Sequence, residues 1–130
     1  MSMAPRHVRG RLKEAVVKFE TFSFNTYCVA GPYEDLPRYL KWRHRKTYEL
    51  PSRGDADGLY FDSLPSKGGI IWLPRVPRRP IDIGILAHEM GHAVIDLMGC
   101  RELPLNTKSQ EPFCYAMQYG VETILKELRK

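Results

Sequence analysis

The segment that most constrains the fold is residues 81–98, IDIGILAHEMGHAVIDLM, which carries the clearest helical pattern in the chain. Pro80 stands just before it, and Asp82 offers a carboxylate to the unpaired N–H groups of a first turn. Gly99 is placed to cap the far end. Apolar residues recur at steps of three and four and predict one apolar stripe: Ile83, Leu86, Met90, Val94 and Leu97.

Two further helices are predicted. One runs from about Ser109 to Leu128, and the shorter one lies within Tyr33–Arg45, with Pro37 near its start. The apolar side of the long helix consists of Phe113, Met117, Gly120, Val121, Ile124 and Leu128.

Three segments are rich in β-branched and aromatic residues and predict strands: residues 15–24, 59–62 and 69–73. The connection SLPSKG predicts a hairpin between the last two. Prolines crowd the chain after residue 73 and favour an edge strand for IIWL, since proline is excluded from central strands. We therefore expect an α+β domain with a small, mostly antiparallel sheet.

Length and composition indicate a single domain over residues 1–130, with a flexible basic N-terminus over residues 1–14. Hydrophobic residues make up 43% of the chain, but no run approaches the roughly 18–20 apolar residues of a membrane span. The basic N-terminus is not followed by an apolar segment, so we expect no secretory signal and a cytoplasmic protein. Three scattered cysteines, Cys28, Cys100 and Cys114, predict reduced thiols rather than a disulfide framework.

The formal net charge of +5 is concentrated in three basic clusters, Arg6–Lys13, Arg38–Lys46 and Arg75–Arg79. Such clusters can make weak contact with nucleic acid or with an acidic protein surface. The alternative is a solvated basic face without a specific ligand, which we favour because no nucleic-acid-binding module matches.

The central motif is His88-Glu89-Met-Gly-His92. Residues four apart project on the same face of a helix, so both imidazoles can reach one Zn²⁺ ion. Glu89 lies about 100° around the helix from His88 and can act as general base toward a water molecule activated by the metal. The alternative is that the three residues form a surface group or a hydrogen-bonded cluster without metal.

A catalytic zinc site needs a third protein ligand. Glu111, in the first turn of the last helix, is our choice, because an antiparallel return of the chain would bring it to the metal. The alternative is that Glu111 belongs to a solvated stripe with Tyr115, Gln118 and Glu122. Cys114 is a rival ligand, since zinc accepts thiolate, and Asp96 is better placed to accept a histidine N–H.

The segments HEMGH and QEPFCYAMQYGVETIL, with a loop of about twenty residues between them, resemble the zincin metallopeptidases with a glutamate ligand. The resemblance covers residues 80–127 and is greatest to the small metallopeptidases of tailed bacteriophages and prophages. It implies zinc bound by His88, His92 and Glu111, with Glu89 as general base. It also implies substrate binding along the edge strand, at Ile70, Ile71 and Trp72, and oxyanion stabilisation by Tyr115 or Tyr119. Aromatic packing is the alternative role for both tyrosines.

These observations together predict a phage- or prophage-encoded zinc metallopeptidase that hydrolyses a peptide or protein substrate. Two other functions stay open: a zinc-stabilised viral structural or assembly protein without turnover, and a basic nucleic-acid-associated protein.

Overall fold

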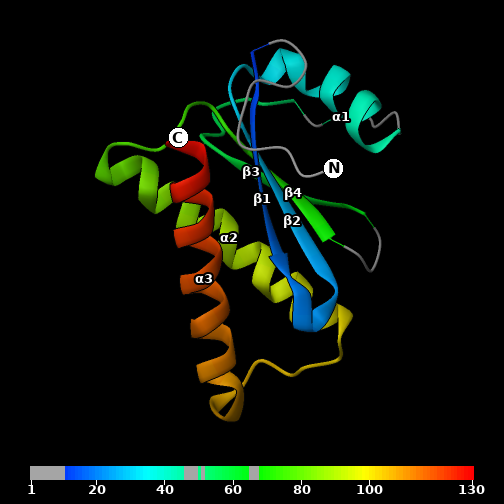
Figure 1. The fold of residues 1–130 in the computed structure, drawn as a ribbon, viewed down its shortest axis with the longest axis vertical. Helices are drawn as coiled ribbons and strands as arrows, with labels where there is room; N and C mark the ends of the chain where they lie inside the picture. The colour runs from blue at the N-terminus through cyan, green and yellow to red at the C-terminus, as the bar shows by residue number, and fades with distance from the viewer. Residues whose placement is uncertain (1–10, 46–49, 51, 65–67) are drawn as a thin grey trace.

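The computed structural model describes residues 11–45, 50, 52–64 and 68–130. Within these residues the chain forms an α+β domain built on one four-stranded sheet (Figure 1). The strands are β1 (Lys13–Phe19), β2 (Phe24–Ala30), β3 (Leu59–Leu64) and β4 (Gly68–Leu73). The α-helices are α1 (Leu36–His44), α2 (Pro80–Cys100) and α3 (Gln110–Leu128), with three short 3-10 turns, η1 (Glu20–Phe22), η2 (Tyr33–Asp35) and η3 (Thr107–Ser109).

The sheet has the order β1-β2-β4-β3 and is mixed, which corrects the prediction of a mostly antiparallel sheet. The pairs β1–β2 and β3–β4 are antiparallel hairpins, as is usual for strands joined by short connections. The central pair β2–β4 is parallel, with Tyr27 opposite Ile70 and Val29 opposite Trp72. Parallel pairing follows because the chain crosses over from β2 through α1 before it forms the second hairpin.

The predicted single strand over residues 15–24 is in fact the first hairpin. Strand β1 ends at Phe19, the η1 turn follows, and β2 begins at Phe24. Ser23 closes the turn in the left-handed conformation, with φ of 50°. The turn contains neither glycine nor proline, so the sequence gives little indication of where the chain reverses.

Strand β4 is not an edge strand, contrary to the prediction, because it pairs with β2 on one side and with β3 on the other. The three nearby prolines, Pro74, Pro77 and Pro80, all lie beyond the end of β4, so they remove no hydrogen bond from its ladder. The edges of the sheet are β1 and β3.

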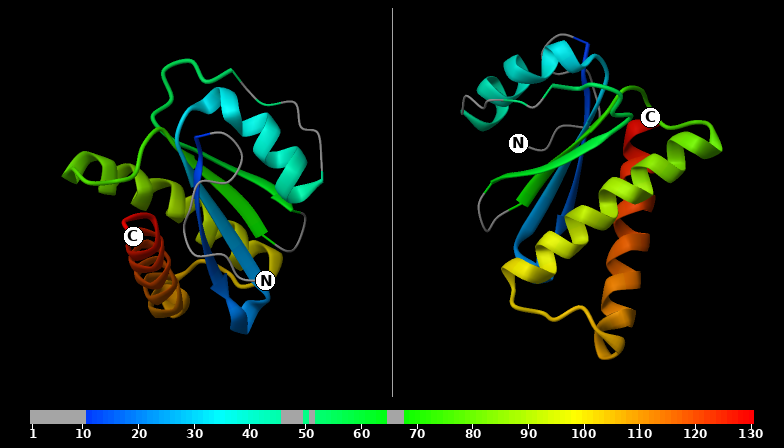
Figure 2. Two further views of the ribbon diagram at one scale, coloured as in Figure 1. Left: turned by 45° about the horizontal axis from the view of Figure 1, so that its top comes forward. Right: turned by 180° about the vertical axis from the view of Figure 1, so that it is seen from behind.

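Two helices cover one face of the sheet and one helix covers the other, as Figure 2 shows. The face toward α2 and α3 holds the larger core, which includes Ile71 and Leu73 of β4. The opposite face packs Ile70 and Trp72 against Leu36, Tyr39 and Leu40 around α1. Because β4 is buried on both faces, its sequence is continuously apolar rather than alternating.

The predicted helices are present close to their expected bounds. Helices α2 and α3 cross where Gly120 packs against Met90. A Cβ on residue 120 would lie 2.6 Å from the Met90 Sδ. Gly120 therefore lets the two helices approach closely. Gly99 lies inside α2, which ends one residue later and is capped at Arg101 rather than at Gly99.

The remaining predictions concern the N-terminus, the cysteines and the membrane. Residues 1–10, like the tip of the second hairpin at 65–67, lie outside the described residues, whereas Leu12 is fully buried and β1 begins at Lys13. Residues 13 and 14, which the prediction included in a flexible N-terminus, therefore belong to β1. All three cysteines are free thiols, as expected, and burial raises the pKa of Cys28. No described helix combines the length and the apolar character of a membrane span.

Candidate functional site

His88 and His92 lie one turn apart on the exposed side of α2. Their ring centroids are 5.0 Å apart and the ring planes meet at 78°. Both side chains face outward because the apolar stripe of α2, including Leu86, Met90 and Leu97, packs against the sheet and α3. Two neighbouring imidazoles on one open face are a suitable donor pair for Zn²⁺.

Glu89 lies beside the two histidines but is turned toward the protein, and only 8% of its surface is exposed. In the described part of the chain, no group donates a hydrogen bond to its carboxylate. Burial raises the pKa of Glu89, and the nearby His88 and His92 act in the opposite direction. The oxygens of Glu89 are not among the fully buried side-chain atoms that lack a partner, so the carboxylate keeps contact with water and is free to accept a proton.

A hollow of about 390 Å³ opens beside this carboxylate. It lies between the first half of α2 and the residues that lead into β3, and it is lined by Asp57, Gly58, Ile81, Gly84, Ile85, His88 and Glu89. Gly58 lies so close to α2 that a Cβ there would be 2.8 Å from the Ile85 Cγ2 and 3.3 Å from the Glu89 Cγ. A glycine at position 58 is therefore what allows β3 to start directly beside Glu89.

Asp96 lies one turn beyond His92, and its carboxylate receives hydrogen bonds from two side chains. The Tyr60 hydroxyl, on β3, donates to Oδ2 over 2.5 Å, and the Cys100 thiol donates to Oδ1 over 3.6 Å. The expected bond from a histidine N–H to Asp96 is not among the hydrogen bonds of the described residues. Asp96 instead ties α2 to the edge strand β3.

Glu111 is exposed in the first turn of α3, and Cys114 is exposed one turn further along. Among the described residues, no group of three or more His, Cys, Asp or Glu side chains is close enough to hold a metal ion. The helix crossing explains why, since α3 meets α2 at Gly120, and Glu111 lies nine residues, or about 13 Å, before that point. The described structure therefore does not place Glu111 beside the histidines, and its role as third ligand stays a prediction.

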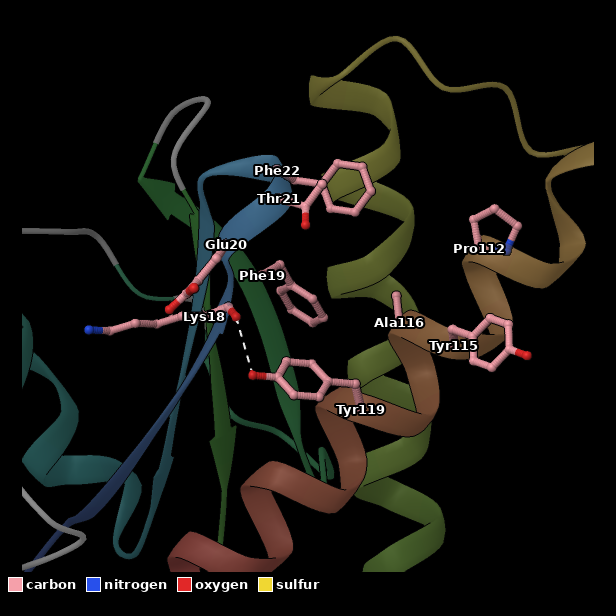
Figure 3. Close-up of a pocket in the computed structure, with 9 residues that line it drawn as sticks. All are labelled: Lys18, Phe19, Glu20, Thr21, Phe22, Pro112, Tyr115, Ala116 and Tyr119. Atoms are coloured by element: carbon pink, nitrogen blue, oxygen red, sulfur yellow. Dashed lines mark hydrogen bonds between the residues drawn. The ribbon is translucent and has the colours of Figure 1, made fainter.

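Tyr115 and Tyr119 lie away from the histidines, in a second hollow of about 550 Å³ between α3 and the first hairpin (Figure 3). The ring of Tyr119 packs edge-on against Phe19, and its hydroxyl donates to the Lys18 carbonyl over 3.5 Å. Figure 3 shows the Tyr115 ring directed away from Phe19 and Phe22. This hollow lies at the β1 edge of the sheet, so Tyr119 has a packing role and neither tyrosine lies beside Glu89.

The substrate-binding role predicted for Ile70, Ile71 and Trp72 rested on an edge position that β4 does not have. All three side chains are fully buried, and the Trp72 Nε1 donates to the Gly31 carbonyl over 2.8 Å. They belong to the core of the sheet. The edge strand that runs beside α2 is β3.

Sequence reasoning missed the wall of the hollow that lies opposite α2, namely Asp57 and Gly58. Nothing in the sequence pattern connects these residues to a helix thirty positions later. The α2 side of the hollow could be predicted from the sequence, however, because its residues recur at helical spacing on one face: Ile81, Gly84, Ile85 and His88.

Comparison of the chain with protein-family models, with curated proteins and with solved structures gives no significant match.

Proposed function

We propose that this protein is a zinc-dependent peptidase whose site is formed by His88, His92 and Glu89. The observation that carries the proposal is the pairing of two outward-facing imidazoles with a largely buried glutamate, whose carboxylate opens onto a hollow and has no hydrogen-bond donor among the described residues. The carboxylate of a largely buried structural residue is normally held by donors. One that is left free beside two metal-type ligands is typical of a site built for proton transfer.

The donor set is compatible with zinc. Neutral imidazole is a preferred zinc ligand, and His88 and His92 are exposed, so a metal reaches them without rearrangement of the core. Zinc at this position supplies a Lewis acid and lowers the pKa of the water it binds toward about 7. Two protein ligands leave several positions open, and Glu111 remains the predicted third ligand, although the described structure does not bring it together with the histidines.

Glu89 is the proposed general base. Its carboxylate lines the hollow next to His88 and can take a proton from the attacking water and return it to the departing amine. The partial burial that raises its pKa also makes it a stronger proton acceptor than an exposed glutamate.

The edge strand β3 is the proposed docking site for the peptide backbone. It pairs with β4 on one side, and in the described sheet its other edge is unpaired. An extended peptide adds to such an edge through main-chain hydrogen bonds, and β3 begins at Leu59, next to the Gly58 that contacts Glu89.

The test compares peptide hydrolysis by the zinc-loaded wild type with Glu89→Gln. Loss of a general base lowers the rate about 10²- to 10⁴-fold, whereas zinc content should be unchanged, because Glu89 is not a ligand in this proposal. Glu122→Gln, on the exposed side of α3, is the matched control and should keep full activity. Retained activity in Glu89→Gln, or no hydrolysis by the zinc-loaded wild type of any peptide in a diverse mixture, would refute the proposal.

A further inference from the structure

The hollow beside Glu89 combines aliphatic walls with acidic side chains. Ile81 and Ile85 supply its apolar surface, and Ile81 is 62% exposed and therefore open to contact. Gly58 and Gly84 add no side chain from either wall, which leaves the space between β3 and α2 open. Its volume, about 390 Å³, is within the range of roughly 300–1,000 Å³ that is usual for ligand sites.

The titratable groups that line the hollow are the carboxylates of Asp57 and Glu89 and the imidazole of His88. Asp57 is exposed at its rim, and among the described residues no ion pair or hydrogen bond engages the Asp57 carboxylate. Arg75 and Arg79 of the nearest basic cluster pair with Asp82 over 3.1 and 2.9 Å, and neither makes an ion pair with Asp57 among the described residues. The Asp57 carboxylate is therefore an exposed acidic group at the rim of a hollow with aliphatic walls.

We propose that this hollow binds a lysine or arginine side chain of the peptide substrate and that Asp57 determines this specificity. The inference rests on the proposed function, because it places the substrate next to His88 and Glu89. The aliphatic stem of a basic side chain packs along Ile81 and Ile85 while its charged end meets Asp57, which is how such side chains normally bury their stems. Gly58 and Gly84 leave room for that stem: a Cβ at residue 58 would lie 2.8 Å from the Ile85 Cγ2, and a Cβ at residue 84 would meet nothing within 4 Å.

An acidic side chain is disfavoured in the same place, since it would meet Asp57 and Glu89 with like charge. The surrounding protein carries a net charge of +5, so a preference for basic substrates would have to arise locally, in this hollow. The overall charge favours an acidic substrate, whereas the hollow favours a basic one.

The experiment uses fluorescein-labelled hexapeptides that are identical except for one central residue, which is lysine, norleucine or glutamate. Binding is measured by fluorescence anisotropy with the full chain, with and without zinc, and cleavage is followed in parallel. Because norleucine has the same stem as lysine, the difference between them isolates the charge. An exposed ion pair is worth up to about a fivefold preference for lysine over norleucine, and this preference should weaken as salt is raised.

Asp57→Asn should abolish the preference, whereas Asp55→Asn, two residues earlier in the same loop, should keep it. Equal binding of lysine and norleucine peptides by the wild type, or an undiminished preference in Asp57→Asn, overturns the inference. The two proposals fail separately. A lysine preference in binding without cleavage supports the subsite and refutes the peptidase, and cleavage without a preference does the reverse.

Discussion

Replacement of Glu89 should stabilise the metal-free protein. The Glu89 residue is 8% exposed, and its carboxylate opens onto the hollow without a hydrogen-bond donor among the described residues, so the folded state solvates it less well than the unfolded chain does. Complete burial of a polar group without a partner costs about 1–3 kcal/mol, and partial loss of solvation costs the lower part of that range. Methionine at this position has nearly the size of glutamate and no polar group to satisfy, so Glu89→Met should regain about 1–2 kcal/mol of unfolding free energy. Glu89→Gln removes only the charge and should regain less.

The gain corresponds to a measurable rise in melting temperature. For a chain of 130 residues the unfolding entropy is about 270 cal/mol/K, so 1–2 kcal/mol raises Tm by about 4–7 °C. The assay is urea and thermal unfolding at pH 7 in the presence of a chelator, with the urea m-value checked for constancy. Glu122→Met, at an exposed site, should change stability by less than about 0.5 kcal/mol.

A loss of about 1 kcal/mol or more in Glu89→Met would refute the reasoning. It would show that Glu89 is a satisfied structural carboxylate and that the site is not built around a free base. A gain in stability that accompanies a loss of activity is the pattern expected when a residue is retained for function.

Three further predictions concern the packing of the sheet and the start of α2. Gly69→Ala should destabilise the protein by about 1–3 kcal/mol in urea unfolding, because its Cβ would collide with the Tyr60 hydroxyl; an unchanged midpoint would contradict this packing. Tyr39→Phe should cost about 1.5–3 kcal/mol, since its hydroxyl donates to the buried Glu14 carboxylate over 2.6 Å; a loss below about 0.5 kcal/mol would contradict it. Hydrogen bonds, chiefly from the Arg79 side chain, hold the pKa of Asp82 well below its usual value, so its contribution to stability is present above the unfolded pKa of about 3.9 and is lost as pH falls below it. The Tm difference between wild type and Asp82→Asn should accordingly be largest above about pH 5 and shrink toward pH 2, and a difference independent of pH would exclude this role.

The helices could be predicted from the sequence because their evidence is local. The stripe of α2, its proline start and the i, i+4 spacing of His88 and His92 all lie within twenty residues, and periodicity alone places both imidazoles on one face. The second hairpin was predictable for the same reason, since β3 and β4 are separated by a short connection.

The topology of the sheet was not predictable in this way. Parallel pairing of β2 with β4 joins residues more than forty positions apart, and no local pattern specifies it. Strand β2 was merged with β1 because the turn between them relies on Ser23 in the left-handed conformation instead of a glycine. The position of β4 inside the sheet, and therefore the burial of Trp72, follows from that pairing.

One part of the candidate site was likewise predictable from local sequence, and the other part depends on the tertiary structure. The helical half, His88, Glu89 and His92, was evident from spacing, but the facing wall at Asp57 and Gly58 depends on where β3 lies in the folded sheet. The orientation of α3 is likewise tertiary. A helix can be predicted over residues 109–128, yet whether Glu111 reaches the histidines depends on where the two helices cross.

Zinc binding tests the central claim most directly. Isothermal titration of the chelator-treated protein should show one zinc ion per chain. Its affinity should be about 100-fold lower in His88→Ala and in His92→Ala, which each lose an imidazole ligand, and unchanged in His44→Ala, at the end of α1 on the opposite face of the sheet. Glu111→Gln, titrated alongside, shows whether that residue is the third ligand. Absence of zinc binding by the wild type, or wild-type affinity in the His88→Ala, His92→Ala double variant, would contradict the account.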